Sequence, residues 1–141
     1  MRQAPRRHGF HAATATEPRH SPIRQAALTI RVDFGAFGYL GPGKIALMEL
    51  ISKHGSIAAA GKEMGMSYRR AWLLVDETNK IFREPLVEKQ MGGSGGGGAR
   101  LTAFGRGVVE RYRAIESAAS KVSAPNMKAL CAGLADRPSE A

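Results

Sequence analysis

Four consecutive residues, Ser67-Tyr68-Arg69-Arg70, have the side chains best suited to bind another molecule. A serine before a run of helix-forming residues is typical of an N-cap, so Ser67 is expected to begin a helix that continues to about Phe82. An arginine in its first turn can donate two hydrogen bonds to O6 and N7 of guanine. Serine and tyrosine hydroxyls suit contacts with phosphates or base edges. The alternative is the solvated start of an ordinary helix.

Two earlier helices are expected to position that first turn. The first covers Pro42–His54, with the proline in its opening turn, and ends at Gly55. Ser56 is expected to cap the second helix. Gly65 is expected to make the tight turn before Ser67, because a residue without Cβ adopts the left-handed backbone conformation at low cost. Two helices joined by a tight turn at this spacing predict a helix-turn-helix.

A glycine-rich segment follows the third helix. Residues 92–98 contain too much glycine for regular structure, and they lie between two β-like runs at 86–90 and 99–102. A glycine-tipped hairpin after a helix-turn-helix is typical of a winged helix, an architecture that places one helix in the major groove of DNA. The predicted fold class is therefore mainly α with a small β-wing. A flexible linker is the alternative interpretation of the glycines, and the apolar residues in both flanking runs oppose it.

Polar residues outside the third helix extend the candidate site. Lys89, Gln90 and Arg100 flank the wing tip, where long side chains rich in donors suit phosphate or minor-groove contacts. Lys62 and the helix start at Ser56 are expected to meet phosphates, because free N–H groups and the helix dipole favour anions. The predicted DNA-binding residues are Ser56, Lys62, Ser67, Tyr68, Arg69, Arg70, Lys89, Gln90 and Arg100.

Trp72, within the third helix, is expected to pack in the core and anchor the turn, with contact to the sugar-phosphate backbone as the alternative. Leu73 and Leu74 are unusual on a helix that faces DNA, and the sequence leaves open whether they touch thymine methyl groups or cover a second subunit. Upstream, the alternation over 28–34 predicts a half-buried strand, and residues 35–43 are expected to form a loop.

The final helix is expected to begin after Thr102 and to cover residues 103–123. It carries a heptad-like apolar stripe, formed by Val108, Tyr112, Ile115, Ala119 and Val122. We expect the stripe to make a homodimer contact, because a small domain has few other surfaces to cover so long a seam; packing on its own domain is the alternative. The predicted domain is thus 28–123, between a disordered basic arm at 1–27 and a flexible tail at 124–141.

Charge and composition narrow the class of protein. The chain has 141 residues and a formal net charge of +9, which favours polyanionic partners such as nucleic acid. It has one cysteine, Cys131, so it cannot form an internal disulfide, and we expect a cytoplasmic protein. No apolar run approaches the length of a membrane span, so we expect no membrane partner. Histidines are scattered, with three in the basic arm, and form no zinc pattern. We expect neither an enzyme nor a cofactor.

The combined pattern resembles the amino-terminal DNA-binding domain of ModE, the molybdate-responsive bacterial transcription regulator, which is related to the amino-terminal domain of LysR-type regulators. The likeness covers about 28–122 and rests on Gly55-Ser56-Ile57, Ala59-Ala60, Gly65-Met66-Ser67-Tyr68, Ala71-Trp72, Asn79, Gly92-Gly93, Gly96-Gly97-Gly98-Ala99, Leu101-Thr102 and Gly105. It implies a winged helix, a dimer and transcriptional control. ModE also carries carboxy-terminal molybdate-binding domains, and since no strand-rich segment follows Val122 the chain resembles a stand-alone member.

The expected function is sequence-specific binding of double-stranded DNA by a cytoplasmic, nucleoid-associated homodimer that regulates transcription. Two alternatives remain open. A nucleoid-type architectural protein with low sequence specificity would also carry high positive charge and a basic arm. A protein-interaction module could use the same helices and glycine loop to hold a protein partner, although the net charge of +9 opposes it.

Overall fold

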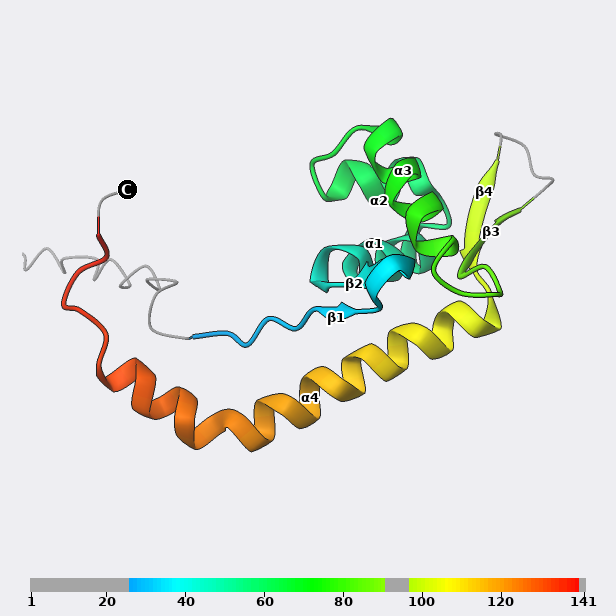
Figure 1. The fold of residues 1–141 in the computed structure, drawn as a ribbon. Helices are drawn as coiled ribbons and strands as arrows, with labels where there is room; N and C mark the ends of the chain where they lie inside the picture. The colour runs from blue at the N-terminus through cyan, green and yellow to red at the C-terminus, as the bar shows by residue number, and fades with distance from the viewer. Residues whose placement is uncertain (1–25, 91–96, 140–141) are drawn as a thin grey trace, which may run out of the picture.

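The computed structural model describes residues 26–90 and 97–139. A small helical domain with a two-stranded wing rests on the first half of one long helix (Figure 1). The elements in chain order are β1 (Val32–Asp33), the 3-10 turn η2 (Gly35–Phe37), β2 (Tyr39–Leu40), α1 (Pro42–His54), α2 (Ile57–Glu63), α3 (Tyr68–Asn79), β3 (Val87–Gln90), β4 (Gly98–Leu101) and α4 (Ala103–Ala132). This arrangement confirms the predicted fold class. Nearly all of the expected basic arm and most of the glycine loop lie outside the described residues.

α1 begins and ends at the residues that the sequence indicated, and α2 and α3 begin directly after their expected serine caps. Gly55 follows α1 with φ of 68°, and its N–H donates to the Ile51 carbonyl at 2.8 Å. The Ser56 hydroxyl then accepts from the backbone N–H of Ala59 at 3.2 Å and caps α2. Gly65 has φ of 72°, the left-handed conformation that a tight turn between crossed helices needs. α3 ends at Asn79, one turn before the expected position.

The core lies where α1 meets the other helices and the wing. Its largest fully buried side chains are those of Ile45, Leu47, Met48, Ile51, Thr78, Leu86 and Tyr112. α2 and α3 approach closely because the residue at their contact is a glycine: a Cβ on Gly61 would stand 2.8 Å from the Cβ of Ala71. Such close packing leaves α3 firmly supported from behind.

The wing is an antiparallel pair in which Val87 faces Leu101 and Gln90 faces Gly98. Asn79, at the end of α3, holds the start of this pair: its side-chain N–H donates to the Val87 carbonyl at 3.0 Å, and its carbonyl oxygen accepts from the N–H groups of Leu86 and Val87. β4 is also tied to the α1–α2 turn, since the Ala99 N–H donates to the Gly55 carbonyl at 2.9 Å. The wing and the helix-turn-helix are therefore held in one fixed relation.

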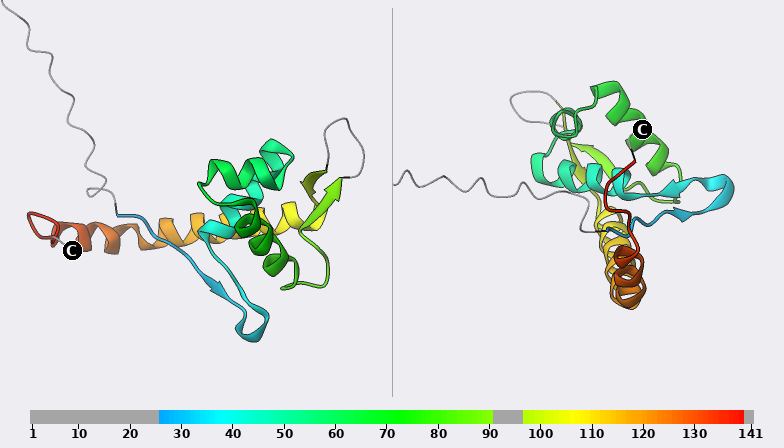
Figure 2. Two further views of the ribbon diagram at one scale, coloured as in Figure 1. Left: turned by 90° about the horizontal axis from the view of Figure 1, so that it is seen from above. Right: turned by 90° about the vertical axis from the view of Figure 1, so that its left-hand side faces the viewer.

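The segment before α1 differs from the sequence expectation. The inward and outward alternation over 28–34 is confirmed, with the even-numbered residues half-buried and the odd-numbered ones exposed. Only Val32–Asp33 forms a strand, however, and it pairs with Tyr39–Leu40, which was expected to be loop. The pairing is possible because Gly35 and Gly38 adopt positive φ in the 3-10 turn and reverse the chain. The resulting hairpin projects from the side of the domain (Figure 2).

The last helix is longer than predicted. α4 begins, as expected, after the cap Thr102, whose hydroxyl accepts from the Gly105 N–H at 2.9 Å. The expected end near Ser123 was wrong, because the helix continues through Pro125 to Ala132. A proline removes one backbone hydrogen bond and bends a helix, but it does not have to end one. Figure 1 shows α4 curving along its length, its last turns bent toward the side on which the domain sits.

Within residues 26–90 and 97–139, the contacts that fasten α4 to the domain come from its first half. The Tyr112 hydroxyl donates to the Ile30 carbonyl at 2.6 Å, and Arg113 donates to Glu49 of α1 at 3.3 Å through Nε and to Glu116 at 2.7 Å. The bonds to Glu49 and then Glu116 raise the pKa of Arg113, and burial raises the pKa of Tyr112, so its hydroxyl stays a donor at neutral pH. Over 26–90 and 97–139, no helix combines the length and apolarity needed to cross a membrane.

Candidate nucleic-acid interface

The first turn of α3 stands clear of the domain. Ser67 has an extended backbone conformation, and its hydroxyl accepts from the Arg70 N–H at 3.1 Å, as a capping serine should. Tyr68 is 57% exposed, and Arg69 and Arg70 are exposed as well. Neither arginine side chain makes an ion pair or hydrogen bond with any residue of the described chain. Both guanidinium groups are available to a partner.

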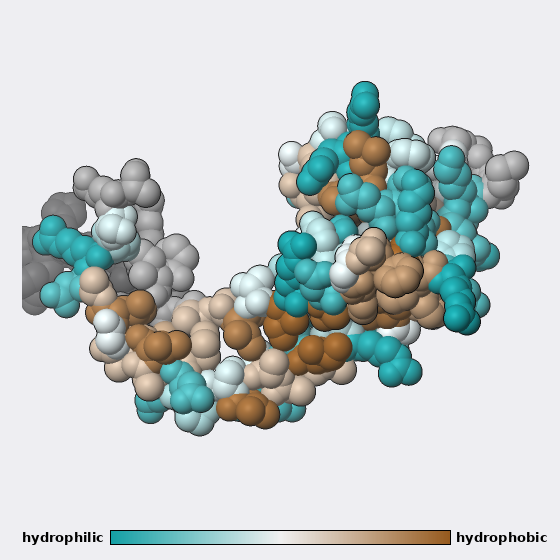
Figure 3. Space-filling view, viewed as in Figure 1, coloured by the Kyte–Doolittle hydropathy of each residue, from teal (hydrophilic) through white to brown (hydrophobic). Residues whose placement is uncertain are grey.

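This turn lies on the side of the domain opposite α4. Figure 1 shows α2 and the start of α3 at the top of the molecule and α4 along its base, and the end-on view in Figure 2 shows the same order. The space-filling view shows hydrophilic side chains over this upper part of the domain (Figure 3). A flat or grooved partner can therefore approach the start of α3 without meeting α4.

A pocket of about 200 Å³ joins three of the predicted site residues. Ser56 comes from the start of α2, Tyr68 from the start of α3 and Lys89 from β3, and Gly97 and Gly98 complete the rim. A side chain at position 98 would crowd this rim, because a Cβ there would stand 3.1 Å from the Gly55 carbonyl oxygen. The pocket is partly polar and opens to solvent. Its size and its lysine suit an anionic group such as a phosphate.

The remaining predicted residues lie outside that pocket. Lys62 is exposed in the last turn of α2, and Gln90 is exposed at the end of β3. Arg100 donates from Nε to Glu88 across the wing at 2.7 Å, although its side chain is 61% exposed. That pairing was not anticipated, and it follows from the register, which sets Glu88 opposite Arg100. The guanidinium of Arg100 thus has a protein partner, unlike Arg69 and Arg70.

The expectation that Trp72 packs in the core was wrong. Its side chain is 39% exposed and lines a second groove between α3 and β3, with Asp76 and Lys89 on its walls. The core face of α3 is formed by Ala71, Val75 and Thr78, and a residue next to Ala71 in a helix points about 100° away from it. Leu73 is exposed too, whereas Leu74 packs against the core.

A small charged cluster joins the ends of α1 and α2. Glu63 forms a short hydrogen bond with His54, and its other oxygen lies 3.7 Å from Lys53. The hydrogen bond from His54, with a smaller effect of Lys53, lowers the pKa of Glu63. The cluster braces the helix-turn-helix from the side. Over the described ranges no three His, Cys, Asp or Glu side chains converge as metal ligands, and the three histidines of the basic arm lie outside those ranges.

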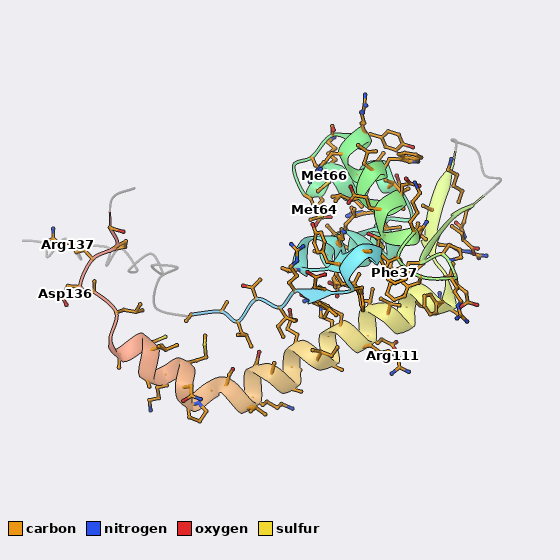
Figure 4. All side chains as sticks on the ribbon, in the orientation of Figure 1. Phe37, Met64, Met66, Arg111, Asp136 and Arg137 are labelled. Atoms are coloured by element: carbon orange, nitrogen blue, oxygen red, sulfur yellow. The ribbon has the colours of Figure 1, made fainter. Side chains whose placement is uncertain are left out.

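Sequence reasoning singled out the first turn of α3 but not all the residues that hold it in place. Asn79 entered only through the likeness to ModE, yet its three hydrogen bonds join α3 to the wing. A polar residue at the end of a helix, eight positions before the next strand, was the available signal. The labelled side chains of Met64 and Met66 in Figure 4 lie beside the turn that precedes α3, and both pack against the core.

No protein-family model matches the chain. It is similar to the molybdenum-pterin-binding protein MopA of Rhodobacter capsulatus, with 42% identity over 82 residues, 58% of this chain and 31% of that protein. It is also similar to the molybdenum transport protein ModE of Azotobacter vinelandii, with 41% identity over 91 residues, 64% of this chain and 33% of that protein. For the DNA-binding transcriptional dual regulator ModE of Escherichia coli K12, the identity is 39% over 74 residues, 52% of this chain and 28% of that protein. The chain spans about a third of the length of these relatives, and over that segment it is similar to ModE-type regulators.

Proposed function

We propose that this protein is a ModE-like regulator of transcription that binds double-stranded DNA at specific sequences as a homodimer. The observation that carries the proposal is the first turn of α3, capped by Ser67 and exposed on the free side of the domain, with two arginines that have no partner in the described chain. The similarity to a protein named as a DNA-binding transcriptional regulator supports it. The protein acts by binding, not by catalysis, in the cytoplasm at the nucleoid.

In the proposed complex, α3 enters the major groove by its first turn. Arg69 and Arg70 read base edges there, and a bidentate contact to guanine contributes roughly 1–3 kcal/mol of discrimination. Lys89 and the Tyr68 hydroxyl, which share one pocket, take a backbone phosphate beside the groove. Lys62, Gln90 and the wing glycines make further backbone contacts. The net charge of +9 supplies the attraction that is independent of sequence.

Apolar residues that remain uncovered on α4 support the proposed homodimer. Val108 and Tyr112 are buried against the domain, but Ile115 is 48% exposed and Val122 is 82% exposed. The first part of the apolar stripe is therefore buried against the domain, and the rest of the stripe is exposed to solvent. Two copies joined along that surface would present two α3 helices to a pseudo-palindromic site.

The proposal covers DNA binding alone. Molybdenum is named for relatives of whose length this chain spans about a third. The proposal rests on Arg69 and Arg70, which lie in the first turn of α3. Their guanidinium groups suit contacts with base edges of DNA.

Selection of bound fragments from genomic DNA tests this function. We expect enrichment of a few fragments that share a motif with two-fold symmetry. In a mobility-shift assay the complex with such a fragment should survive a large excess of random DNA. Loss of the complex to random DNA, with no enriched motif, would instead indicate an architectural protein. Absence of any DNA affinity at low salt would favour a protein-interaction module.

A further inference from the structure

Leu73 is an apolar side chain on the outer face of α3. It is 37% exposed, and within the described chain neither the buried core nor the residues packed against it include Leu73, whereas its neighbour Leu74 packs there. Arg69 and Leu73 are each two residues from the buried Ala71, so both point about 160° away from it, at roughly 100° per residue. Four residues apart, they lie next to each other on the outward face of the helix.

The α4 helix does not account for this exposed leucine. The first turn of α3 lies on the opposite side of the domain from α4 (Figures 1 and 2). Leu73 follows that turn on the same face of the helix as Arg69. The proposed homodimer, joined along α4, therefore leaves the outer face of α3 open. A partner that meets Arg69 reaches Leu73 as well.

Two carboxylates limit how much of this face suits DNA. Asp76, the next outward residue after Leu73, is ion-paired with Lys80 at 2.8 Å. Glu77 is 55% exposed and lies 3.7 Å from Lys44. Because phosphates repel carboxylates, the second half of α3 is unsuited to a groove of the duplex. Leu73 is therefore the last outward-facing side chain in the part of α3 that suits such a groove.

The major groove of DNA offers a particular apolar group to such a side chain. That group is the C5-methyl of thymine, and the other groups that distinguish the bases there are hydrogen-bond donors and acceptors. We propose that Leu73 contacts a thymine methyl group in the major groove, so that the sequence preference of this protein depends on that base. This inference rests on the proposed function, in which α3 enters the groove, and it deepens that function by assigning a base to a residue without polar side-chain atoms.

The helix limits how far that thymine lies from the base that Arg69 contacts. Four residues rise about 6 Å along α3. Successive base pairs are about 3.4 Å apart along the duplex. The thymine should therefore lie within about two base pairs of the guanine that Arg69 contacts. A symmetric site bound by two copies contains this guanine and thymine once in each half.

Replacement of thymine by deoxyuridine tests the contact, because it removes the methyl group and keeps the base pair. The duplex carries the site selected from genomic DNA, and each symmetric pair of thymines is replaced in turn. Fluorescence anisotropy measures the affinity of each duplex for wild type and for Leu73→Ala. We expect one pair, close to the guanines, to weaken wild-type binding about 15-fold, since the loss of one buried methyl group corresponds to about fourfold in each half of the site.

The Leu73→Ala variant shows whether that methyl group and Leu73 touch each other. It should bind the unmodified site at least about 15-fold more weakly than wild type, because it loses more apolar contact than one methyl group. The same deoxyuridine pair should then weaken its binding little further, as expected when two changes remove one contact. Urea denaturation should show that this exposed substitution leaves the fold intact.

Lys62→Ala is the matched control. Lys62 is exposed in the last turn of α2 and is proposed to contact a phosphate, so its loss weakens binding without reaching a thymine. This variant should keep the full effect of the deoxyuridine pair. Leu73→Met retains an apolar side chain of similar volume and should keep most of that effect too.

Three results would overturn the inference: no deoxyuridine pair weakens wild-type binding, Leu73→Ala shows the deoxyuridine effect in full, or Leu73→Ala binds the unmodified site as tightly as wild type. Each of these leaves the proposed function standing as long as wild type prefers the selected site to random DNA. Wild-type protein without that preference would remove the proposed function and this inference with it.

Discussion

The helix-turn-helix and the outer half of α4 are both helical, but they owe their structure to different causes. Each short helix of the helix-turn-helix has a capping serine or a left-handed glycine at its boundary and a buried face behind it. The outer half of α4 has a proline inside it and no buried residue. The first region is specified locally and then supported by packing. The second has helical residues but no buried face against the described domain. The comparison indicates that α3 presents a preformed surface, while α4 presents an incomplete one.

The largest effect should come from the point where α4 meets the wing. A Cβ on Gly105 would stand 2.1 Å from the Leu86 carbonyl oxygen, a contact with backbone that cannot move aside. Gly105→Ala should lower the free energy of unfolding by roughly 3 kcal/mol or more, measured by urea denaturation. Gly107→Ala is the matched control, because nothing lies within 4 Å of a Cβ at that position. The control should be neutral or stabilising, by up to about 1 kcal/mol. Equal stability of the two variants would show that the junction is not tightly packed.

The second prediction concerns the outer surface of α4. Ile115→Glu places a charge within the proposed dimer contact and should raise the dimer dissociation constant at least about 100-fold, since burying an unpaired charge costs several kcal/mol. Sedimentation equilibrium measures this change. Ala114→Glu adds the same charge one residue away from the stripe and should leave the dimer intact. Unchanged association of Ile115→Glu would place the dimer contact elsewhere.

The third prediction separates base contacts from phosphate contacts. Arg69→Ala and Arg70→Ala should each weaken binding to the selected site by roughly 1–3 kcal/mol and affect random DNA less. Lys89→Ala should weaken both about equally and reduce the slope of log affinity against log salt by about 1. Anisotropy titrations on site and random duplexes at several salt concentrations distinguish these patterns. Equal losses on both duplexes for the arginine variants would assign them to phosphates.

The smallest effect is a pH dependence of stability. Because the hydrogen bond with His54 lowers the pKa of Glu63 below its ordinary 4.5, the ionised carboxylate stabilises the fold above that pH. This contribution should disappear as the pH falls through the lowered pKa. Glu63→Gln should therefore melt at a lower temperature than wild type at neutral pH and at nearly the same temperature in strong acid. A difference in melting temperature that persists in acid would show that the residue acts through packing rather than charge.

Local signals in the sequence predicted most of the domain. Serine caps, positive-φ glycines and apolar spacing are effects of a few neighbouring residues, which is why α1, α2 and the start of α3 agree with the prediction. The β1–β2 pairing was missed, because two residues on each strand give almost no periodic signal. Trp72 was misplaced, because a helix face shared by a core and an open groove cannot be divided from spacing alone. DNA contact by the nine proposed residues stays a prediction.

The amino-acid order on its own specified where the helices of the domain begin, which face of each is apolar, and that an arginine pair follows the N-cap of α3, because capping and periodicity act within one or two turns. Only the folded chain brought Ser56, Tyr68 and Lys89 around one pocket, paired Arg100 with Glu88, and set α3 and α4 on opposite sides. These relations join residues far apart along the chain. Close packing around α1 and the register of the wing decide them, and neither can be read from neighbouring residues.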